Sequence, residues 1–222
     1  MRVSMVVRNG FSELAAQMFN ESDDVSLKNL ISSKYSENDL LTYLLDDDPL
    51  VARAAATALG LIGSMESVPA LVKNLKNRDV RASFNTEMAL WSIWSRSGQT
   101  TVDRLLNIGK RSLKNEKFNE AVELFSKVIE MEPSFAEGYN QRAIAYFMLE
   151  DWDNSLTDCL QTIGLNPHHF GAYAGMGHVY LRLGKIDEAV DAYRIALAIN
   201  PNLISIAETL IRLGRVSEEE EE

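Results

Sequence analysis

Few side chains in this sequence could carry acid, base or metal chemistry. Its three histidines, His168, His169 and His178, fall close together, and Cys159 is the single cysteine. A metal ion needs neutral nitrogens that converge on one point, but adjacent histidines point in different directions and no cysteine or carboxylate stands at ligand spacing nearby. The chain also lacks a Ser-His-Asp order, a P-loop and a GxGxxG context. We therefore expect no catalytic residue, no metal site and no cofactor.

The composition excludes several classes of protein. The 222 residues are 46% hydrophobic and 24% charged, and the formal net charge is −10. This acidic balance disfavours nucleic-acid binding, which requires a lysine- and arginine-rich surface. One cysteine cannot form an internal disulfide, which favours the cytoplasm or another reducing compartment. No stretch approaches ~18 uncharged apolar residues, so we expect no membrane insertion. Residues 217–222 form an acidic tail that we expect to be solvated.

A repeat of 34 residues runs through the second half of the chain. Residues 34 positions apart occupy equivalent places in the repeat, and we call each such set a column. One column holds three prolines, and three others hold small, aromatic or apolar residues: Pro133, Pro167 and Pro201; Gly109, Ala143 and Gly177; Phe118, Trp152 and Ile186; Phe125, Cys159 and Tyr193. A small residue where two helices cross, an aromatic on the second helix and a proline that stops it describe a helix-turn-helix unit. This pattern resembles the tetratricopeptide repeat (TPR).

The resemblance implies three TPR units, at 102–135, 136–169 and 170–203, followed by a capping helix at 204–213. We place this TPR domain at 99–216. Within it, Cys159 occupies a column otherwise filled by Phe125 and Tyr193, which indicates a small core residue and not a nucleophile.

A second period, of 31 residues, relates positions between 36 and 96. The matched pairs are Leu40 and Leu71, Leu44 and Leu75, Asp48 and Asp79, Ala58 and Ala89, Leu59 and Leu90, and Ile62 and Ile93. The string DPLVARAAATALGLIG resembles a HEAT repeat in which Asp48 caps the second helix and Pro49 occupies its first turn. We expect residues 1–98 to form N-terminal helices and HEAT-like repeats. The predicted fold class is an all-α, elongated solenoid of helix pairs.

Two apolar columns of the TPR repeat become charged in the middle unit. Arg142 stands where the neighbouring repeats have Ile108 and Met176, and Asp158 stands where they have Leu124 and Ala192. A buried charge requires a partner. We predict a structural pair between Arg142 and Asp158, and the alternative is an arginine that binds a ligand.

In TPR proteins the first helix of each repeat lines a concave groove, and the resemblance assigns partner binding to that face. The candidate groove residues here are Lys110, Lys114, Asn140, Phe147, Gly171, Gly175, His178 and Arg182. The three cations could meet carboxylates of a guest, Asn140 could bond its backbone, and Phe147 with Leu181 could hold an apolar side chain. TPR proteins that grip the acidic ends of heat-shock chaperones use a clamp of lysine, asparagine and arginine. The clamp positions here are Leu106, Lys110, Gln141, Gly171 and Gly175, so we do not expect that clamp.

Two further features have two interpretations each. Gly171 and Gly175 cost about 1 kcal/mol each relative to alanine, which suggests that a guest backbone or a flat ligand approaches closely. The alternative is close packing of the preceding repeat's second helix. Trp91 and Trp94 share one face of the last HEAT helix, and we expect a buried junction with the first TPR helix around Leu105 and Ile108 rather than an exposed patch.

These observations favour a non-enzymatic scaffold or adaptor that binds a peptide or a partner helix of another protein in the TPR groove. One alternative is a HEAT-type lyase or another cofactor-handling enzyme, although residues 1–98 contain neither histidine nor cysteine. A self-assembling structural protein is the other, so the sequence leaves a homo-oligomer open.

Overall fold

The computed structural model describes residues 10–16, 18 and 24–214, and the acidic tail at 217–222 lies outside them. The chain divides into two compact units, Met1–Trp94 and Ser95–Glu222, and this division lies four residues before the domain boundary predicted from the sequence. All regular structure in the described ranges is helical, with no strand. The predicted all-α class of helix pairs is therefore confirmed.

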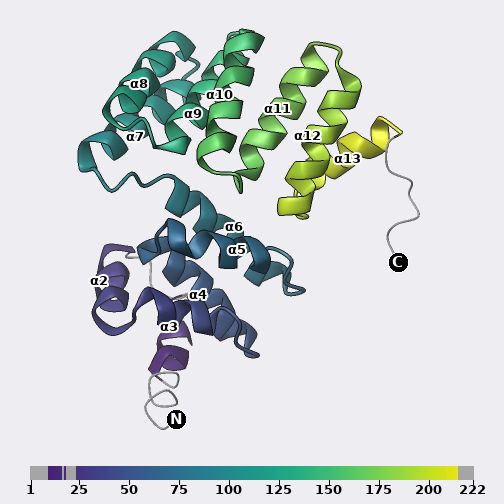
Figure 1. Ribbon diagram of the computed structural model, residues 1–222. Coiled ribbons are helices and arrows are strands. Elements are labelled where there is room, and N and C mark those ends of the chain that lie inside the picture. The colour runs from purple at the N-terminus through teal and green to yellow at the C-terminus, as the bar shows by residue number, and fades with distance from the viewer. Residues whose placement is uncertain (1–9, 17, 19–23, 215–222) are drawn as a thin grey trace. The chain divides into compact units, whose positions relative to one another are not determined.

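Besides the helical residues 10–16 and 18, the described part of the first unit contains five α-helices and one short 3-10 helix. They are α2 (Asp24–Lys34), α3 (Glu37–Tyr43), α4 (Pro49–Ile62), η1 (Met65–Ser67), α5 (Val68–Asn74) and α6 (Val80–Trp94). α3 packs on α4, α5 packs on α6, and α4 lies against α6 (Figure 1). Of the twelve residues that the 31-residue period relates, the two aspartates act as caps, and every apolar one except Ile62 is buried.

The HEAT period is visible in the turns as well as in the core. Asp48 caps α4 by accepting a hydrogen bond from the Leu50 amide at 2.9 Å, with Pro49 in the first turn as predicted. Asp79, 31 residues later, accepts a bond from the Arg81 amide at 2.8 Å. The same capping geometry therefore begins the second helix of each pair.

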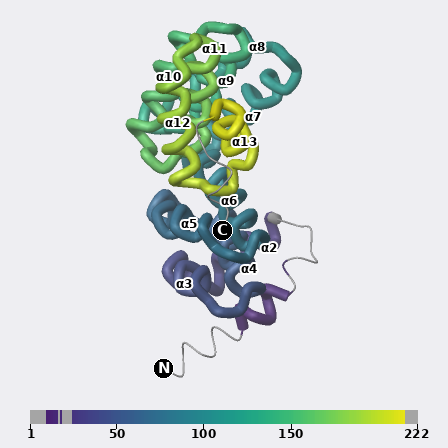
Figure 2. The backbone as a smooth tube through the Cα atoms, turned by 90° about the vertical axis from the view of Figure 1, so that its right-hand side faces the viewer, coloured from purple at the N-terminus to yellow at the C-terminus, as the bar shows by residue number. Residues whose placement is uncertain are grey.

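The second unit is a series of antiparallel helix pairs. Its helices are α7 (Thr100–Lys114), α8 (Phe118–Met131), α9 (Ala136–Met148), α10 (Trp152–Leu165), α11 (Phe170–Arg182), α12 (Ile186–Ile199) and α13 (Ile204–Arg212). Each helix packs on the next from α7 to α13, and α9 also contacts α7 and α11 (Figures 1 and 2). α7, α9 and α11 are thus the neighbouring first helices of three repeats.

The turn between the two helices of each repeat is the same in all three units. The backbone amides of Lys117, Asp151 and Lys185 bond to carbonyls five residues earlier, each at 2.9 Å. The preceding residue has a positive φ: 59° at Glu116 and Glu150, and 71° at Gly184. This closure places one residue in the left-handed region, where glycine avoids a Cβ clash and glutamate does not.

Small residues of the first helices face aromatic residues of the second helices. A Cβ at Gly109 would collide with the ring of Phe125, and one at Gly177 would collide with the ring of Tyr193. The middle repeat has Ala143 and Cys159 at the corresponding positions. The ring that fills the space between the two helices in the outer repeats is therefore replaced by a small thiol in the middle one.

Candidate functional site

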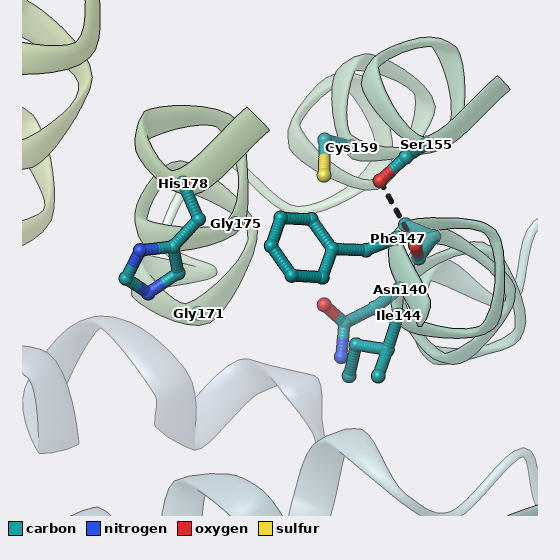
Figure 3. Close-up of a pocket in the computed structure, with 9 residues that line it drawn as sticks. Asn140, Ile144, Phe147, Ser155, Cys159, Gly171, Gly175 and His178 are labelled. Atoms are coloured by element: carbon teal, nitrogen blue, oxygen red, sulfur yellow. Dashed lines mark hydrogen bonds between the residues drawn. The ribbon is translucent and has the colours of Figure 1, made fainter. Parts of the chain in front are cut away.

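A pocket lies between α9, α10 and α11 in the second unit (Figure 3). Its empty volume is about 480 Å³, which includes its open mouth. The lining residues are Asn140, Ala143, Ile144 and Phe147 from α9, Ser155 and Cys159 from α10, and Gly171, Gly175 and His178 from α11. Five of the eight candidate groove residues predicted from the sequence, all on α9 and α11, thus surround one cavity.

The exchange of an aromatic ring for a thiol explains why the pocket is here. Cys159 and Ala143 line it, and they are the pair that replaces the glycine and the aromatic of the other repeats. Cys159 is 2% exposed, and burial followed by the nearby Asp158 charge raises the pKa of its thiol to about 12. The thiol is therefore a small apolar surface and not an activated nucleophile.

Asn140 supplies the polar group of the pocket, and its amide orientation is determined by its neighbour. The side chain is 4% exposed, and its Nδ2 donates to Glu137 Oε2 at 3.0 Å. Because a carboxylate only accepts, the amide nitrogen must face Glu137 and the oxygen must face away from it. Figure 3 shows that oxygen on the pocket side. Within the described residues, no donor bonds to Asn140 Oδ1.

Glu137 is a buried carboxylate that links α9 to α7 and to the N-cap of α11. It is 1% exposed, and its oxygens lie 3.3 Å from Lys110 Nζ of α7 and 3.1 Å from His169 Nε2 at the start of α11. Gln141 Nε2 donates to it at 2.8 Å. Burial acts to raise the pKa of this carboxyl, but the bonds from His169 and Gln141 and the charge of Lys110 bring its pKa below the ordinary value.

His169 is the N-cap of α11 and a neutral hydrogen-bond donor. Its Nδ1 accepts the Ala172 amide at 3.1 Å, so the ring proton lies on Nε2 and is donated to Glu137. The sequence spacing around the histidines did not indicate this carboxylate, because the fold brings Glu137 back from 32 residues earlier. A comparison of equivalent repeat positions could have indicated that His169 has a polar partner, since it replaces the apolar residues Phe135 and Leu203 of the other repeats.

Two of the three candidate cations already have partners in the chain. Lys110 Nζ bonds to Ser95 Oγ at 2.9 Å in addition to its ion pair with Glu137. Arg182 lies 5.2 Å above the ring of Trp152 and 3.5 Å from Glu150. Lys114 is exposed, and no ion pair involves it in the described ranges. Lys110 thus has a buried internal partner and Arg182 an exposed one, and the binding of guest carboxylates by these cations stays a prediction.

The aromatic side of the pocket is formed by Phe147 and His178. The Phe147 ring packs edge-on against Trp152, with centroids 5.2 Å apart, and its centroid lies 6.4 Å from that of His178. His178 Nδ1 shares a 2.7 Å hydrogen bond with the Tyr193 hydroxyl. Desolvation by the surrounding helices lowers the pKa of His178, which favours a neutral ring at the pocket mouth.

The structure places Arg142 directly against Asp158. Arg142 Nε and Nη2 donate to the two carboxylate oxygens at 2.7 and 2.9 Å, and Nη1 donates to Ser126 Oγ at 3.0 Å. The Asp158 hydrogen bond, opposed by desolvation, raises the pKa of the arginine. All three donor groups of the guanidinium are used within the unit, so this geometry is that of a structural pair and not of a waiting ligand site.

The structure describes the surroundings of both the two glycines and the two tryptophans for which the sequence left two interpretations. Gly171 and Gly175 both line the pocket, and a Cβ at Gly175 would lie 3.3 Å from Cys159 Sγ on the preceding repeat's second helix. This contact agrees with the close-packing interpretation of Gly175, and the approach of a guest there stays a prediction. Trp94 is buried, and its ring centroid is 5.3 Å from that of Trp91 in an edge-on arrangement. The junction with the first TPR helix concerns how the two units meet and stays a prediction.

The first unit also has a cavity, between α4 and α6. Its lining residues are Thr57, Gly60, Leu61, Asn85, Met88, Ala89 and Ser92. None of these side chains is a carboxylate, histidine, cysteine or lysine, so this cavity has no group suited to proton transfer near neutral pH.

Two searches of the described ranges have negative results. No helix there is both long and apolar enough to cross a membrane. No group of three or more histidine, cysteine, aspartate or glutamate side chains in those ranges could hold a metal ion.

Comparison with known families agrees with the helix pairs of both units. Residues 106–170 and residues 171–203 match the tetratricopeptide repeat family, and residues 26–106 match the HEAT repeats family. The chain is thus a helical-repeat protein with TPR units after HEAT repeats, and the family resemblance predicted from the sequence is confirmed.

Curated relatives share part of this chain. A TPR repeat-containing protein of Rhizobium etli is 25% identical over 130 residues, which cover 59% of this chain and 63% of that protein. The small glutamine-rich tetratricopeptide repeat-containing protein of Dictyostelium discoideum is 32% identical over 115 residues, which cover 52% of this chain and 34% of that one. The matches therefore span less than two thirds of the length of either relative.

Solved structures match at the level of one TPR domain. The first TPR domain of Spaghetti, bound to the HSP90 peptide SRMEEVD, is 26% identical with a TM-score of 0.50, over 51% of this chain and 90% of that chain. The TPR domain of Arabidopsis OM64 also has a TM-score of 0.50, at 23% identity, over 51% of this chain and 94% of that chain. The second comparison shows the fold alone.

Proposed function

We propose that the second unit holds a segment of a partner protein against the inner face formed by α7, α9 and α11, and that the chain works as a non-enzymatic scaffold or adaptor. The observation that carries the proposal is the pocket between α9 and α11, bordered by exposed apolar side chains. Ile144 is 42% exposed beside it, and Met148, one turn further along the same face of α9, is 50% exposed. Apolar side chains exposed around a groove are typical of a protein interface.

The chemistry of the pocket supports binding rather than catalysis. Its titratable groups are His178, whose pKa is lowered, and Cys159, whose pKa is raised to about 12. A catalytic thiol requires a lowered pKa, and no carboxylate of the pocket lining orients the histidine. The cavity of the first unit has no acid or base in its lining, which disfavours the lyase alternative.

The similar TPR domain of Spaghetti was solved with an HSP90 peptide, which supports a peptide as the guest but not the same peptide. Four of the five clamp positions carry Leu106, Gln141, Gly171 and Gly175 here, and the fifth, Lys110, is paired with Glu137. We therefore propose a protein partner other than an acidic chaperone tail. Because the one cysteine is buried and unpaired, we also propose the cytoplasm or another reducing compartment.

A matched pair of variants tests the location of the binding face. Met148→Glu introduces a charge on the inner face of α9, and Leu160→Glu introduces the same charge at a side chain of α10 that is 51% exposed and does not line the pocket. Proteins recovered from native extract by the full chain should be lost with Met148→Glu and retained with Leu160→Glu. Equal recovery by both folded variants would place the interface elsewhere, and light scattering of the parent would reveal self-association.

A further inference from the structure

The pocket exists because the middle repeat lacks the aromatic ring that its neighbours have, and this absence has a use if the proposed function is right. We propose that the pocket receives one apolar side chain of the guest, and that a backbone N–H beside that side chain donates to Asn140 Oδ1. The guest is thus a non-acidic peptide segment with an apolar anchor. This inference rests on the proposed binding face and specifies its ligand.

The walls of the pocket define the anchor as apolar. Ala143 and Cys159 are part of its lining. Figure 3 shows Ile144 and Phe147 on the α9 side, and Gly171 and Gly175, which have no side chains, on the α11 side. The Ser155 hydroxyl already donates to the Ala143 carbonyl at 2.9 Å. An apolar side chain loses water here and leaves Asn140 Oδ1 as the polar group that still needs a partner, whereas a charged side chain would lose its hydration with no counter-ion.

Asn140 specifies a donor beside the anchor. Its nitrogen is held by Glu137, so the side chain can offer only its oxygen to the pocket. No donor in the described residues bonds to this oxygen, so a guest donor would satisfy it. A backbone N–H, which accompanies the anchor side chain of any peptide except at proline, is a donor of the right kind.

The charges around the pocket exclude a guest carboxylate. A carboxylate at the anchor position would face the Asn140 oxygen, which is an acceptor, with the Glu137 carboxylate behind it. The nearest lysine, Lys110, lies 3.3 Å from Glu137 and is neutralised by it. The positions that hold cations in the chaperone-tail clamp are Gly171 and Gly175 in this chain. A free acidic C-terminus therefore finds acceptors and no free cation in the pocket.

The outer repeats show how to design a variant in which the pocket is filled. Ala143→Gly together with Cys159→Phe recreates the pair that Gly109 forms with Phe125, so the ring should fill the pocket from inside while the groove surface stays unchanged. Random twelve-residue peptides displayed on phage are selected on the full 222-residue chain, and the enriched peptides are synthesised. We expect them to share an apolar residue and to lose about tenfold or more in affinity for the double variant.

A second measurement keeps the test independent of how well that variant folds. Methylation of each backbone nitrogen of an enriched peptide removes one donor at a time, and methylation at one position at or next to the anchor should lower affinity for the parent chain by about tenfold. Gly175→Leu should block the pocket from α11, whereas Gly164→Leu, at a glycine of α10 with nothing within 4 Å of an added Cβ, should bind as the parent does.

The outcomes separate the two proposals. If enriched peptides lose affinity for Met148→Glu but bind the double variant as tightly as the parent, the groove is correct and the anchor pocket is wrong. Enrichment of acidic peptides, or tight binding of the peptide SRMEEVD at the pocket, would also contradict the proposal of an apolar anchor in a non-acidic guest. If no peptide is enriched, or if those enriched are indifferent to both Met148→Glu and Gly175→Leu, the proposed function itself fails.

Discussion

The ion pair between Arg142 and Asp158 offers a quantitative test of how the middle repeat is held together. Arg142→Met removes a guanidinium whose side chain is 20% exposed, and leaves a carboxylate whose side chain is 4% exposed without its bidentate partner. Asp158→Leu instead leaves the guanidinium with Ser126 at 3.0 Å and with the rings of Tyr139 and Tyr146, each 5.8 Å away. The two single changes are therefore unequal.

The expected sizes follow from these exposures. Stranding a buried charge costs about 3 to 5 kcal/mol, and we expect about 3 for Arg142→Met because water reaches the arginine side of the pair. Asp158→Leu should cost about 2 kcal/mol, since the arginine keeps other contacts and part of its hydration. The double change replaces an ion pair by two apolar side chains and should cost no more than about 2 kcal/mol, which gives a coupling energy near 3 kcal/mol.

Urea unfolding followed by circular dichroism measures the four free energies, and hydrogen exchange in α9 and α10 assigns them to the second unit. Arg182→Met is the control, because its pair with Glu150 is 56% and 71% exposed and should contribute less than about 1 kcal/mol. Single losses that add to within about 0.5 kcal/mol in the double variant would show that the two residues do not stabilise the repeat as a pair.

Three other features can each be tested by substitution. Because the folded pKa of Glu137 lies below its ordinary value of 4.5, unfolded chains take up protons first as the pH falls, so stability present above about pH 4.5 should decline through the folded pKa. Glu137→Gln should make the unfolding free energy measured from pH 6 to 3 less steep, and an unchanged slope would contradict the network. Glu116→Gly should stabilise its turn, with φ of 59°, by up to about 1 kcal/mol, and Gly184→Ala should destabilise its own by a similar amount in urea unfolding. Cys159→Phe alone should cost about 1 to 3 kcal/mol by overpacking against Ala143, and Ala143→Gly in the same chain should recover most of the loss, or else the pocket does not result from this exchange.

The sequence by itself determined the helix pairs, because their causes are local and periodic. Spacings of 31 and 34 residues located the helices of both units, and Asp48 and Pro49 located the start of α4. The pair of Arg142 and Asp158 could be predicted for the same reason, since two columns changed together within one repeat. Comparing equivalent positions of the repeats predicts a side-chain pair when both residues differ from their equivalents and both lie in the same helix pair.

Only the tertiary structure decided which side chains the groove offers to a guest. Glu137 binds Lys110 of the preceding repeat and His169 at the N-cap of α11, and neither contact follows from a helical period, because both depend on how successive pairs stack. The pocket has the same origin: the sequence shows a cysteine in an aromatic column, but not whether neighbouring side chains would close over the missing ring. Ala143, Cys159 and Gly175 leave the space open because their side chains are too short to fill the place that the rings of Phe125 and Tyr193 take in the outer repeats.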